Sequence, residues 1–245
     1  MLGKWWIRIV VVVLGTLLAG TAQAGRRPHT WVWDAEVLPE RGVEVESWVT
    51  DRIYKKGADI TEVWLAPIVG LTDRLELAMP LQWSHAQAGN RVGIDWYGAE
   101  LRWRLRSPDP IESGGWSPLL RAAVRKSLAS RDALVGELTL VGSWDATEKL
   151  RLTANVGALA DAAGRKVQLQ YAAGISYVVM PDLRLGVEVF SVDFAKAPAT
   201  AKGGTLVGPS LGWTHGRLWT TAGYVLGITE FAADGMFRLM WGIAI

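Results

Sequence analysis

Nine charged side chains share the polar faces of short segments in which apolar and polar residues alternate. They are Glu76, Glu100, Arg102, Arg121, Arg125, Glu137, Arg151, Arg184 and Glu188. Successive side chains of a β-strand point to opposite faces, so Glu100 and Arg102 lie on one face and Leu101 on the other. Opposite charges gathered on one face can filter ions that pass along it, or can neutralise one another in a buried network. Either role requires a sheet that holds the charges together.

Catalytic and metal chemistry find little support in the sequence. A hydrolytic nucleophile needs a base within hydrogen-bond reach, and the chain has three histidines, at positions 29, 85 and 215. Ser84 precedes His85, but neighbours on a strand point to opposite faces, so we interpret His85 as a solvated loop residue. A lipid-modifying enzyme is therefore only a third hypothesis. The sequence has no metal-ligand spacing and no glycine-rich phosphate loop, and we expect no cofactor.

Composition excludes further classes of protein. The chain of 245 residues has no cysteine, which rules out disulfides and thiolate metal sites. Two of its 26 basic residues, Lys4 and Arg8, fall in a predicted signal peptide, which leaves 24 basic residues against 24 acidic ones. A formal charge of zero argues against a nucleic-acid partner.

Residues 1–24 have the pattern of a cleaved signal peptide. Lys4 and Arg8 accompany an apolar run over residues 9–19, and the triplet Ala-Gln-Ala at residues 22–24 is a small-x-small cleavage site. The run is short for a membrane-spanning helix, which needs about 20 residues, so we expect cleavage before Gly25 rather than an anchor. Every later apolar run soon meets a charged residue. Such an exported chain can span a membrane only as a closed barrel.

The alternation predicts twelve strands. Their ranges are 42–53, 60–69, 74–84, 94–106, 118–127, 134–144, 149–159, 167–180, 183–191, 204–214, 217–228 and 236–245. Short turns with Gly, Asp or Pro alternate with longer links, as at the periplasmic and extracellular rims of outer-membrane barrels. The Pro- and Gly-rich link 107–117 is an exception on the short side. We therefore predict an all-β, antiparallel, up-and-down transmembrane β-barrel over residues 41–245.

Aromatic rings on the apolar face favour a belt that contacts lipid. The expected girdle residues are Trp83, Tyr97, Trp103, Trp144, Tyr171, Trp213 and Phe237. Amphipathic rings concentrate at both membrane interfaces, and these seven fall near strand ends. The alternative, a soluble β-sandwich with these rings in its core, is less favoured. We expect the protein in the outer membrane of a Gram-negative bacterium.

The outward links suggest a second lipid partner. The pairs at residues 55–56 (Lys-Lys) and 165–166 (Arg-Lys) lie in links predicted to face outward. They could contact the phosphates of lipopolysaccharide, although we favour the interpretation that they form a solvated rim.

Three short segments resemble those of known barrels. The final strand, residues 237–245 (FRLMWGIAI), is similar to the strand by which the barrel-assembly machinery recognises its clients, with Ile245 in place of the usual Phe. Residues 38–45 (LPERGVEV) and 69–77 (VGLTDRLEL) resemble small proteobacterial outer-membrane barrels described as transporters, including a group associated with degradation of aromatic compounds. The resemblance implies a barrel, its location and the assembly machinery as a partner, but it does not identify a solute.

The turns also suggest how the inner charges pair. In the simplest register Glu76 and Arg121 both lie across from Arg102. The same register places Arg125 across from Glu137. A slip by one residue would turn these charges toward lipid, so only slips by two remain as alternatives.

The predicted inner face is uneven. Charges are concentrated in the first seven strands, whereas the last five carry mainly Gly, Ala, Ser and Thr. Twelve tilted strands enclose a radius of about 12 Å, which small side chains cannot fill. Either a solvated lumen passes small solutes passively, or a plug fills the space and the barrel is a non-conducting structural or binding protein. Residues 25–40 are the candidate plug because Trp31 and Trp33 precede the first strand. We favour the passive channel.

Overall fold

Thirteen β-strands make up the regular structure of the computed structural model, which describes residues 27–54, 57–86, 93–106, 115–128, 134–162, 165–197 and 202–245. The strands are β1 (Val43–Ile53), β2 (Ile60–Thr72), β3 (Leu75–Ala78), β4 (Leu81–Ala86), β5 (Gly93–Arg104), β6 (Trp116–Ser127), β7 (Leu134–Asp145), β8 (Leu150–Asp161), β9 (Val167–Met180), β10 (Leu183–Lys196), β11 (Gly204–His215), β12 (Leu218–Gly227) and β13 (Gly235–Ala244). The predicted signal peptide and the lysine pair at residues 55–56 lie outside the described residues.

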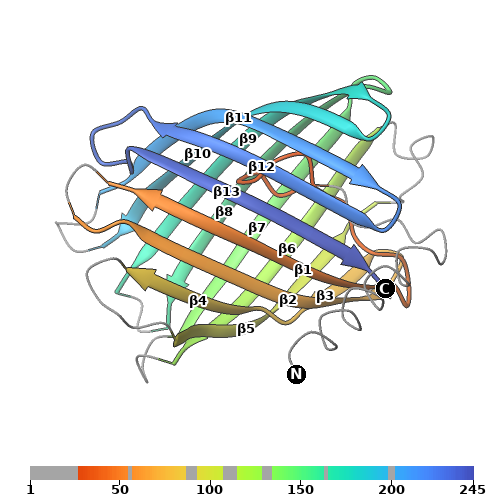
Figure 1. Cartoon of the computed structure of the whole chain (residues 1–245). Coiled ribbons are helices and arrows are strands. Elements are labelled where there is room, and N and C mark those ends of the chain that lie inside the picture. Colours follow the sequence, from red (N-terminus) through yellow and green to blue (C-terminus); the bar gives the residue numbers. More distant parts are fainter. Residues whose placement is uncertain are drawn as a thin grey trace, which may run out of the picture.

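The sheet closes on itself because β1 pairs with both β2 and the last strand, β13. The short strands β3 and β4 share one position in the ring, since β2 and β5 flank both of them. The described strands therefore form a closed, antiparallel barrel of twelve strand positions, with each strand beside its neighbour in sequence (Figure 1). The predicted fold is confirmed.

The predicted strand 74–84 is split in two because Pro80 has no N–H to donate to a ladder. On the neighbouring strand β2, Pro67 lies opposite the gap between β3 and β4. Two backbone hydrogen bonds bridge this gap, from Met79 N to Pro67 O (3.1 Å) and from Gly98 N to Pro80 O (3.0 Å). The ring therefore stays closed across an interruption in regular hydrogen bonding.

The two rims differ in the length of their connections. Tight turns join β7 to β8, β9 to β10 and β11 to β12 at the rim where β1 begins and β13 ends. Longer links lie at the other rim, where β10 runs five residues past the predicted end at 191. Of the long link predicted on the tight-turn side, 107–117, only residues 115–117 are described. This asymmetry is the one expected of periplasmic and extracellular rims.

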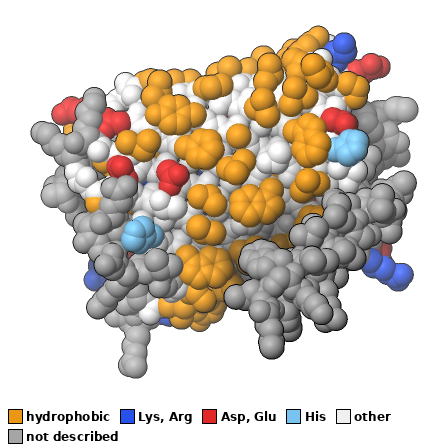
Figure 2. Space-filling model, in the orientation of Figure 1, with side chains coloured by type: hydrophobic (Ala, Val, Ile, Leu, Met, Phe, Trp, Pro, Cys, Tyr) orange, Lys and Arg blue, Asp and Glu red, His pale blue; other side chains and the backbone are white. Residues whose placement is uncertain are grey.

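The two faces of the wall differ in polarity. Outward side chains such as Leu138, Leu140 and Val156 are about half exposed, and hydrophobic side chains cover much of the surface in Figure 2. Inward side chains such as Glu100 and Thr139 are buried. An apolar exterior around a polar interior is the arrangement that lipid requires of a barrel. Within the described ranges, no helix is long and apolar enough to cross a bilayer.

Leu138 provides a test of which face meets lipid, because its side chain points outward near the middle of β7. A basic side chain at the bilayer midplane destabilises a barrel by about 2–4 kcal/mol, and near the interface by about 0–1 kcal/mol. We expect Leu138→Arg to lower the free energy of unfolding by the larger amount and Leu134→Arg, at the end of the same face, by the smaller. Urea titration of barrels refolded in vesicles measures both, and equal losses would contradict the assignment.

Candidate functional site

The inner charges form a continuous chain of ion pairs across four strands. Arg102 on β5 contacts Glu76 on β3 (Nη1–Oε1 2.7 Å) and Glu100 on its own strand (Nε–Oε1 2.5 Å). Arg121 on β6 contacts Glu100 (Nη2–Oε2 2.6 Å) and Glu137 on β7. All five side chains are buried, so these charges neutralise one another away from bulk water.

The strand register agrees with expectation around Arg102 but not around Arg125. Arg102 pairs with Glu76 on one side and with Arg121 on the other, as predicted. Arg125, however, lies two residues out of register with Glu137. The long arginine side chain spans this offset, because its Nη2 lies 2.6 Å from Glu137 Oε2.

Residues 27–40 are here called the N-terminal segment, of which residues 27–38 lie inside the barrel and residues 39–40 are exposed at its rim. The segment contacts inward side chains from strands on all sides of the ring: His29 with Ser210 on β11, Trp33 with Asn155 on β8, Ala35 with Ser143 on β7, and Leu38 with Glu76 on β3. A chain that contacts opposite walls of a closed sheet must occupy its lumen. Figure 1 shows part of the segment, in red, behind β12 and β13.

Both limbs of the N-terminal segment run toward the tight-turn rim. At one end Arg27 Nη2 lies 2.9 Å from Glu46 Oε2, close to the start of β1. At the other end Leu38 N donates to Glu76 Oε2 (2.7 Å), next to the start of β3. The apex, residues 30–33, contacts the middle of β8 and β10. The segment is thus a U-shaped loop inserted from the periplasmic side.

Glu188 on β10 holds the apex in place. This carboxylate is 1% exposed and accepts hydrogen bonds from Thr30 N (3.1 Å), Thr30 Oγ1 (2.5 Å), Trp31 N (2.7 Å) and Val32 N (3.3 Å). Among the described residues these are its only hydrogen-bond donors. Hydrogen bonds to an ionised acceptor are stronger than neutral ones. A charged side chain of the wall is therefore hydrogen-bonded by the N-terminal segment and not by a neighbouring strand.

The small inward residues of the later strands make room for this segment. A Cβ atom at Gly174 would lie 2.5 Å from His29 Nε2, and a Cβ atom at Gly223 would overlap the side chain of Thr30. A side chain of the segment can approach a strand backbone this closely only where the strand residue has no Cβ atom. The part of the inner face that is poor in charge is the surface on which the segment packs.

Acidic side chains attach the second limb to the wall. Arg151 Nη1 lies 3.1 Å from Asp34 Oδ2 and 2.6 Å from Glu36 Oε1. Its Nε lies 2.7 Å from Asp145 Oδ1, so the arginine links the segment to β7. Arg184 forms a weaker contact with the wall, a hydrogen bond from its Nη1 to the hydroxyl of Ser176 on β9 at 3.5 Å.

Two indole rings of the apex stack on arginines. The guanidinium carbons of Arg102 and Arg121 lie 5.0 and 4.1 Å from the ring centroid of Trp33. That of Arg238 lies 3.5 Å from the ring centroid of Trp31. Cations over aromatic faces attract the ring electrostatically. The ion-pair chain of the wall is therefore in direct contact with the segment.

A cavity of about 290 Å³ lies on the long-loop side of the apex. We call it the outer cup. Trp31 and Trp33 of the segment line it, together with five charged side chains: Arg52, Arg125, Glu137, Lys202 and Arg238. On the tight-turn side of the segment, among the described residues, a much smaller space of about 20 Å³ is lined by Arg27, Glu46 and their neighbours.

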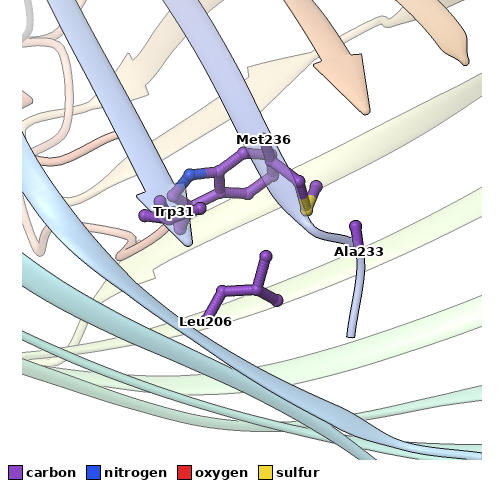
Figure 3. Close-up of a cluster of buried hydrophobic side chains, with 5 residues drawn as sticks. Trp31, Leu206, Ala233 and Met236 are labelled. Carbon is purple, nitrogen blue, oxygen red and sulfur yellow. The ribbon is translucent and has the colours of Figure 1, made fainter. Parts of the chain in front are cut away.

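The link between β12 and β13 narrows the outer cup. Its residue Ala233 packs with Trp31, Leu206 and Met236 in a buried apolar cluster (Figure 3). The cluster joins the segment to β11 and β13 on the long-loop side of Glu188. The apex is thus held by hydrogen bonds to the Glu188 carboxylate and, on the long-loop side of it, by apolar contacts with β11 and β13.

The predicted girdle residues lie on the outer surface. Five are between 36% and 51% exposed, and two are partly exposed; the five are Tyr97, Trp103, Trp144, Tyr171 and Phe237, and the two are Trp83 and Trp213. Trp116 belongs with them, since it is 45% exposed and pairs with Trp144 across the sheet. A strand predicted to begin at residue 118 leaves out Trp116, although this residue continues the same alternation.

The histidines are dispersed. His85 lies in β4 and not in a link, which corrects the expectation. Among the described residues its buried Nδ1 has no hydrogen-bond partner, while Ser84 donates to Asp95. His215 Nδ1 lies 2.8 Å from Asp182 Oδ2 at the tight-turn rim. In the described ranges, no three acidic or histidine side chains are placed to hold a metal ion.

Comparison with solved structures identifies the fold. No protein-family model and no curated protein matches the chain. An outer-membrane channel from Pseudomonas putida F1 is similar at a TM-score of 0.61 and 13% identity, over 89% of this chain and 100% of that one. The NanC porin gives 0.58 and 12% (83% and 100% covered), and the KdgM porin 0.55 and 10% (82% and 99%). The fold is that of the outer-membrane β-barrels of Gram-negative bacteria.

Proposed function

We propose that the protein is an outer-membrane channel for small solutes whose lumen is closed by the N-terminal segment. The observation that carries the proposal is the fit between segment and wall at Glu188. There the segment supplies the carboxylate's four hydrogen bonds and fills the space beside the small residues. The alternative is a permanently closed barrel with a structural or binding role.

The wall charges support a channel over a permanently closed barrel. The carboxylate partners of Arg121 and Arg125 are on strands, so these ion pairs do not require the segment. Glu188 and the oxygens that accept from the segment would meet water in an emptied lumen, where water can replace the lost donors. Withdrawal would leave a charged wall around a radius of about 12 Å.

The U shape of the segment supports reversible opening. Both limbs run to the tight-turn rim, so the loop can leave the lumen toward the periplasm without threading an end through the barrel. Most of the contacts of the segment with the wall described above are hydrogen bonds and ion pairs, which exchange with water more readily than a packed apolar core. Such a loop suits a gate.

Several finer expectations remain proposals. They are cleavage before Gly25, the barrel-assembly machinery and lipopolysaccharide as partners, and the proteobacterial transporter type associated with degradation of aromatic compounds. The filter role of the wall charges and the interfacial role of the aromatic girdle are proposals as well. Sequencing the N-terminus of the exported protein tests the first of these.

Removing the segment is expected to open the lumen. In planar bilayers, deletion of residues 27–37 should give long-lived conducting states that are rare in the full mature chain, because the freed lumen is wide enough for hydrated ions. Gly223→Leu should act in the same direction by displacing Thr30 without deleting residues. Gly136→Leu is the matched control, since a Cβ there meets open space. Absence of conductance after the deletion would contradict the channel.

Loss of the Glu188 carboxylate is expected to loosen the segment. The chain has no cysteine, so Ala35→Cys, at a buried position, provides a single thiol that reports on docking. Adding Glu188→Ala should raise its rate of modification by a water-soluble maleimide at least about tenfold, since one charge-assisted hydrogen bond contributes about 1.5–3 kcal/mol. The exposed control Glu230→Cys should react equally in both backgrounds. An unchanged rate at residue 35 would show that Glu188 does not hold the segment.

Acid is expected to weaken docking through His29, which lies outside the membrane-spanning strands. Burial lowers the pKa of His29 from its usual value near 6.5, with Glu188, Asp34, Arg151 and Arg184 as the charged groups around it. The undocked histidine takes up a proton first as the pH falls, so docking is stable above about pH 6.5 and weakens below it. Modification of the thiol at residue 35, relative to residue 230, should be faster at pH 5 than at pH 7.5. His29→Gln should abolish the difference, and a difference that persists would assign it to another group.

A further inference from the structure

Cations outnumber carboxylates in the outer cup. Four basic side chains line it, from strands on different sides of the ring and from the link before β11, with Glu137 as the acidic one. Two of these cations already have carboxylate partners. Arg52 Nη2 lies 2.8 Å from Glu62 Oε2, and Arg125 Nη2 lies 2.6 Å from Glu137 Oε2. The excess positive charge therefore resides on the other two.

Neither Arg238 nor Lys202 forms an ion pair with a carboxylate among the described residues, although Glu62 and Glu188 attract Arg238 from a longer distance. Arg238 donates to neutral oxygens, Thr50 Oγ1 (2.8 Å) and Thr30 O (2.9 Å). Lys202 Nζ lies 5.6 Å from the ring centroid of Phe231. A guanidinium with neutral acceptors retains its charge, and in a cavity with protein walls that charge attracts an anion more strongly than in water.

Aromatic and aliphatic side chains make up most of the uncharged lining of the outer cup, with Tyr54, Gln168 and Gln170 as polar members. Trp31 and Phe190 stack with their ring centroids 5.8 Å apart, and Leu206, Phe231 and Met236 continue the same surface. Pockets for drug-sized ligands measure about 300–1,000 Å³. A cavity of about 290 Å³ thus fits a smaller molecule, with one charged end and an apolar body.

We propose that the outer cup is a binding site for a small organic carboxylate, whose anionic group contacts Arg238 and Lys202 and whose apolar body lies against Trp31 and Phe190. A small organic carboxylate would then be the class of solute that the proposed channel passes, and this part of the inference rests on the proposed function. Binding itself requires only the closed state, because the N-terminal segment forms the floor of the cup.

Isothermal titration calorimetry on the full mature chain in detergent tests the site with two probes of nearly equal shape. Cyclohexanecarboxylate should bind, and the neutral cyclohexanecarboxamide should bind at least about tenfold more weakly, since a hydrogen bond to a charged group exceeds a neutral one by roughly that factor. Raising the salt concentration should weaken the first and leave the second unchanged.

Two variants locate the binding. Arg238→Gln and Lys202→Gln should each lower the affinity for the carboxylate about five- to tenfold. Lys202→Gln separates binding from docking of the segment, because this lysine contacts Phe231 of the link before β13, whereas Arg238 also contacts Thr30 of the segment. Lys166→Gln is the matched control: Lys166 also lies over a phenylalanine ring, at 4.9 Å from Phe194, but does not line the cup. It should change the affinity less than twofold.

The outcomes separate this proposal from the channel. Equal affinity for the two probes, no binding of either, or unchanged affinity in Lys202→Gln would overturn the carboxylate site. If the full mature chain binds the carboxylate as expected but the variant that lacks residues 27–37 does not conduct, the channel is overturned and the binding site stands.

Discussion

The structure depends on one buried carboxylate that receives its described hydrogen bonds from the N-terminal segment and none from neighbouring strands. Glu188 lies on the inner face among small residues, and its described hydrogen bonds come from three consecutive backbone N–H groups and one hydroxyl of the N-terminal segment. A carboxylate away from water is tolerated only where donors surround it. The segment and this part of the wall therefore complete each other. If the segment leaves, the Glu188 carboxylate loses its hydrogen-bond donors, and if the carboxylate is removed, the N–H groups of the segment lose their acceptor. In both cases only water could replace the lost partner.

On the opposite side of the lumen, charged side chains of neighbouring strands pair with one another. There the chain of ion pairs from Glu76 to Arg125 is carried by β3, β5, β6 and β7, and each arginine has a carboxylate on a strand. Trp33 stacks against this chain without supplying a charge to it. The ion pairs of this wall are made between strands, although Leu38 N of the segment also donates to Glu76, whereas the described hydrogen bonds of Glu188 all come from the segment. A barrel built in this way can lose the segment without losing the ring of backbone hydrogen bonds that closes it. This division is the physical basis for interpreting the segment as a gate.

Much of the fold could be predicted because a period of two is a strong signal over many strands. The strand order, the rims, the side on which each charge lies and the pairing around Arg102 all follow from alternation and turn length. Three features did not follow. The split at Pro80 depends on its missing backbone N–H, which the alternation of side chains does not register, and the offset at Arg125 depends on the reach of a long side chain. The contact between Glu188 and residue 30 joins positions 158 apart, and no local pattern encodes such a distance. The sequence showed the glycines of the inner face and offered residues 25–40 as a candidate plug, but it did not show which residues meet.

The central claim is that the segment itself closes the lumen. A removable cross-link tests it, because the chain has no cysteine of its own and Ala35 N lies 3.3 Å from Ser143 Oγ. In a Glu188→Ala barrel that carries Ala35→Cys and Ser143→Cys, single-channel recording would follow oxidation and then reduction of the disulfide. We expect no channel openings while the segment is cross-linked to β7 and repeated openings after reductant is added. Equal conductance in the oxidised and reduced states would contradict it.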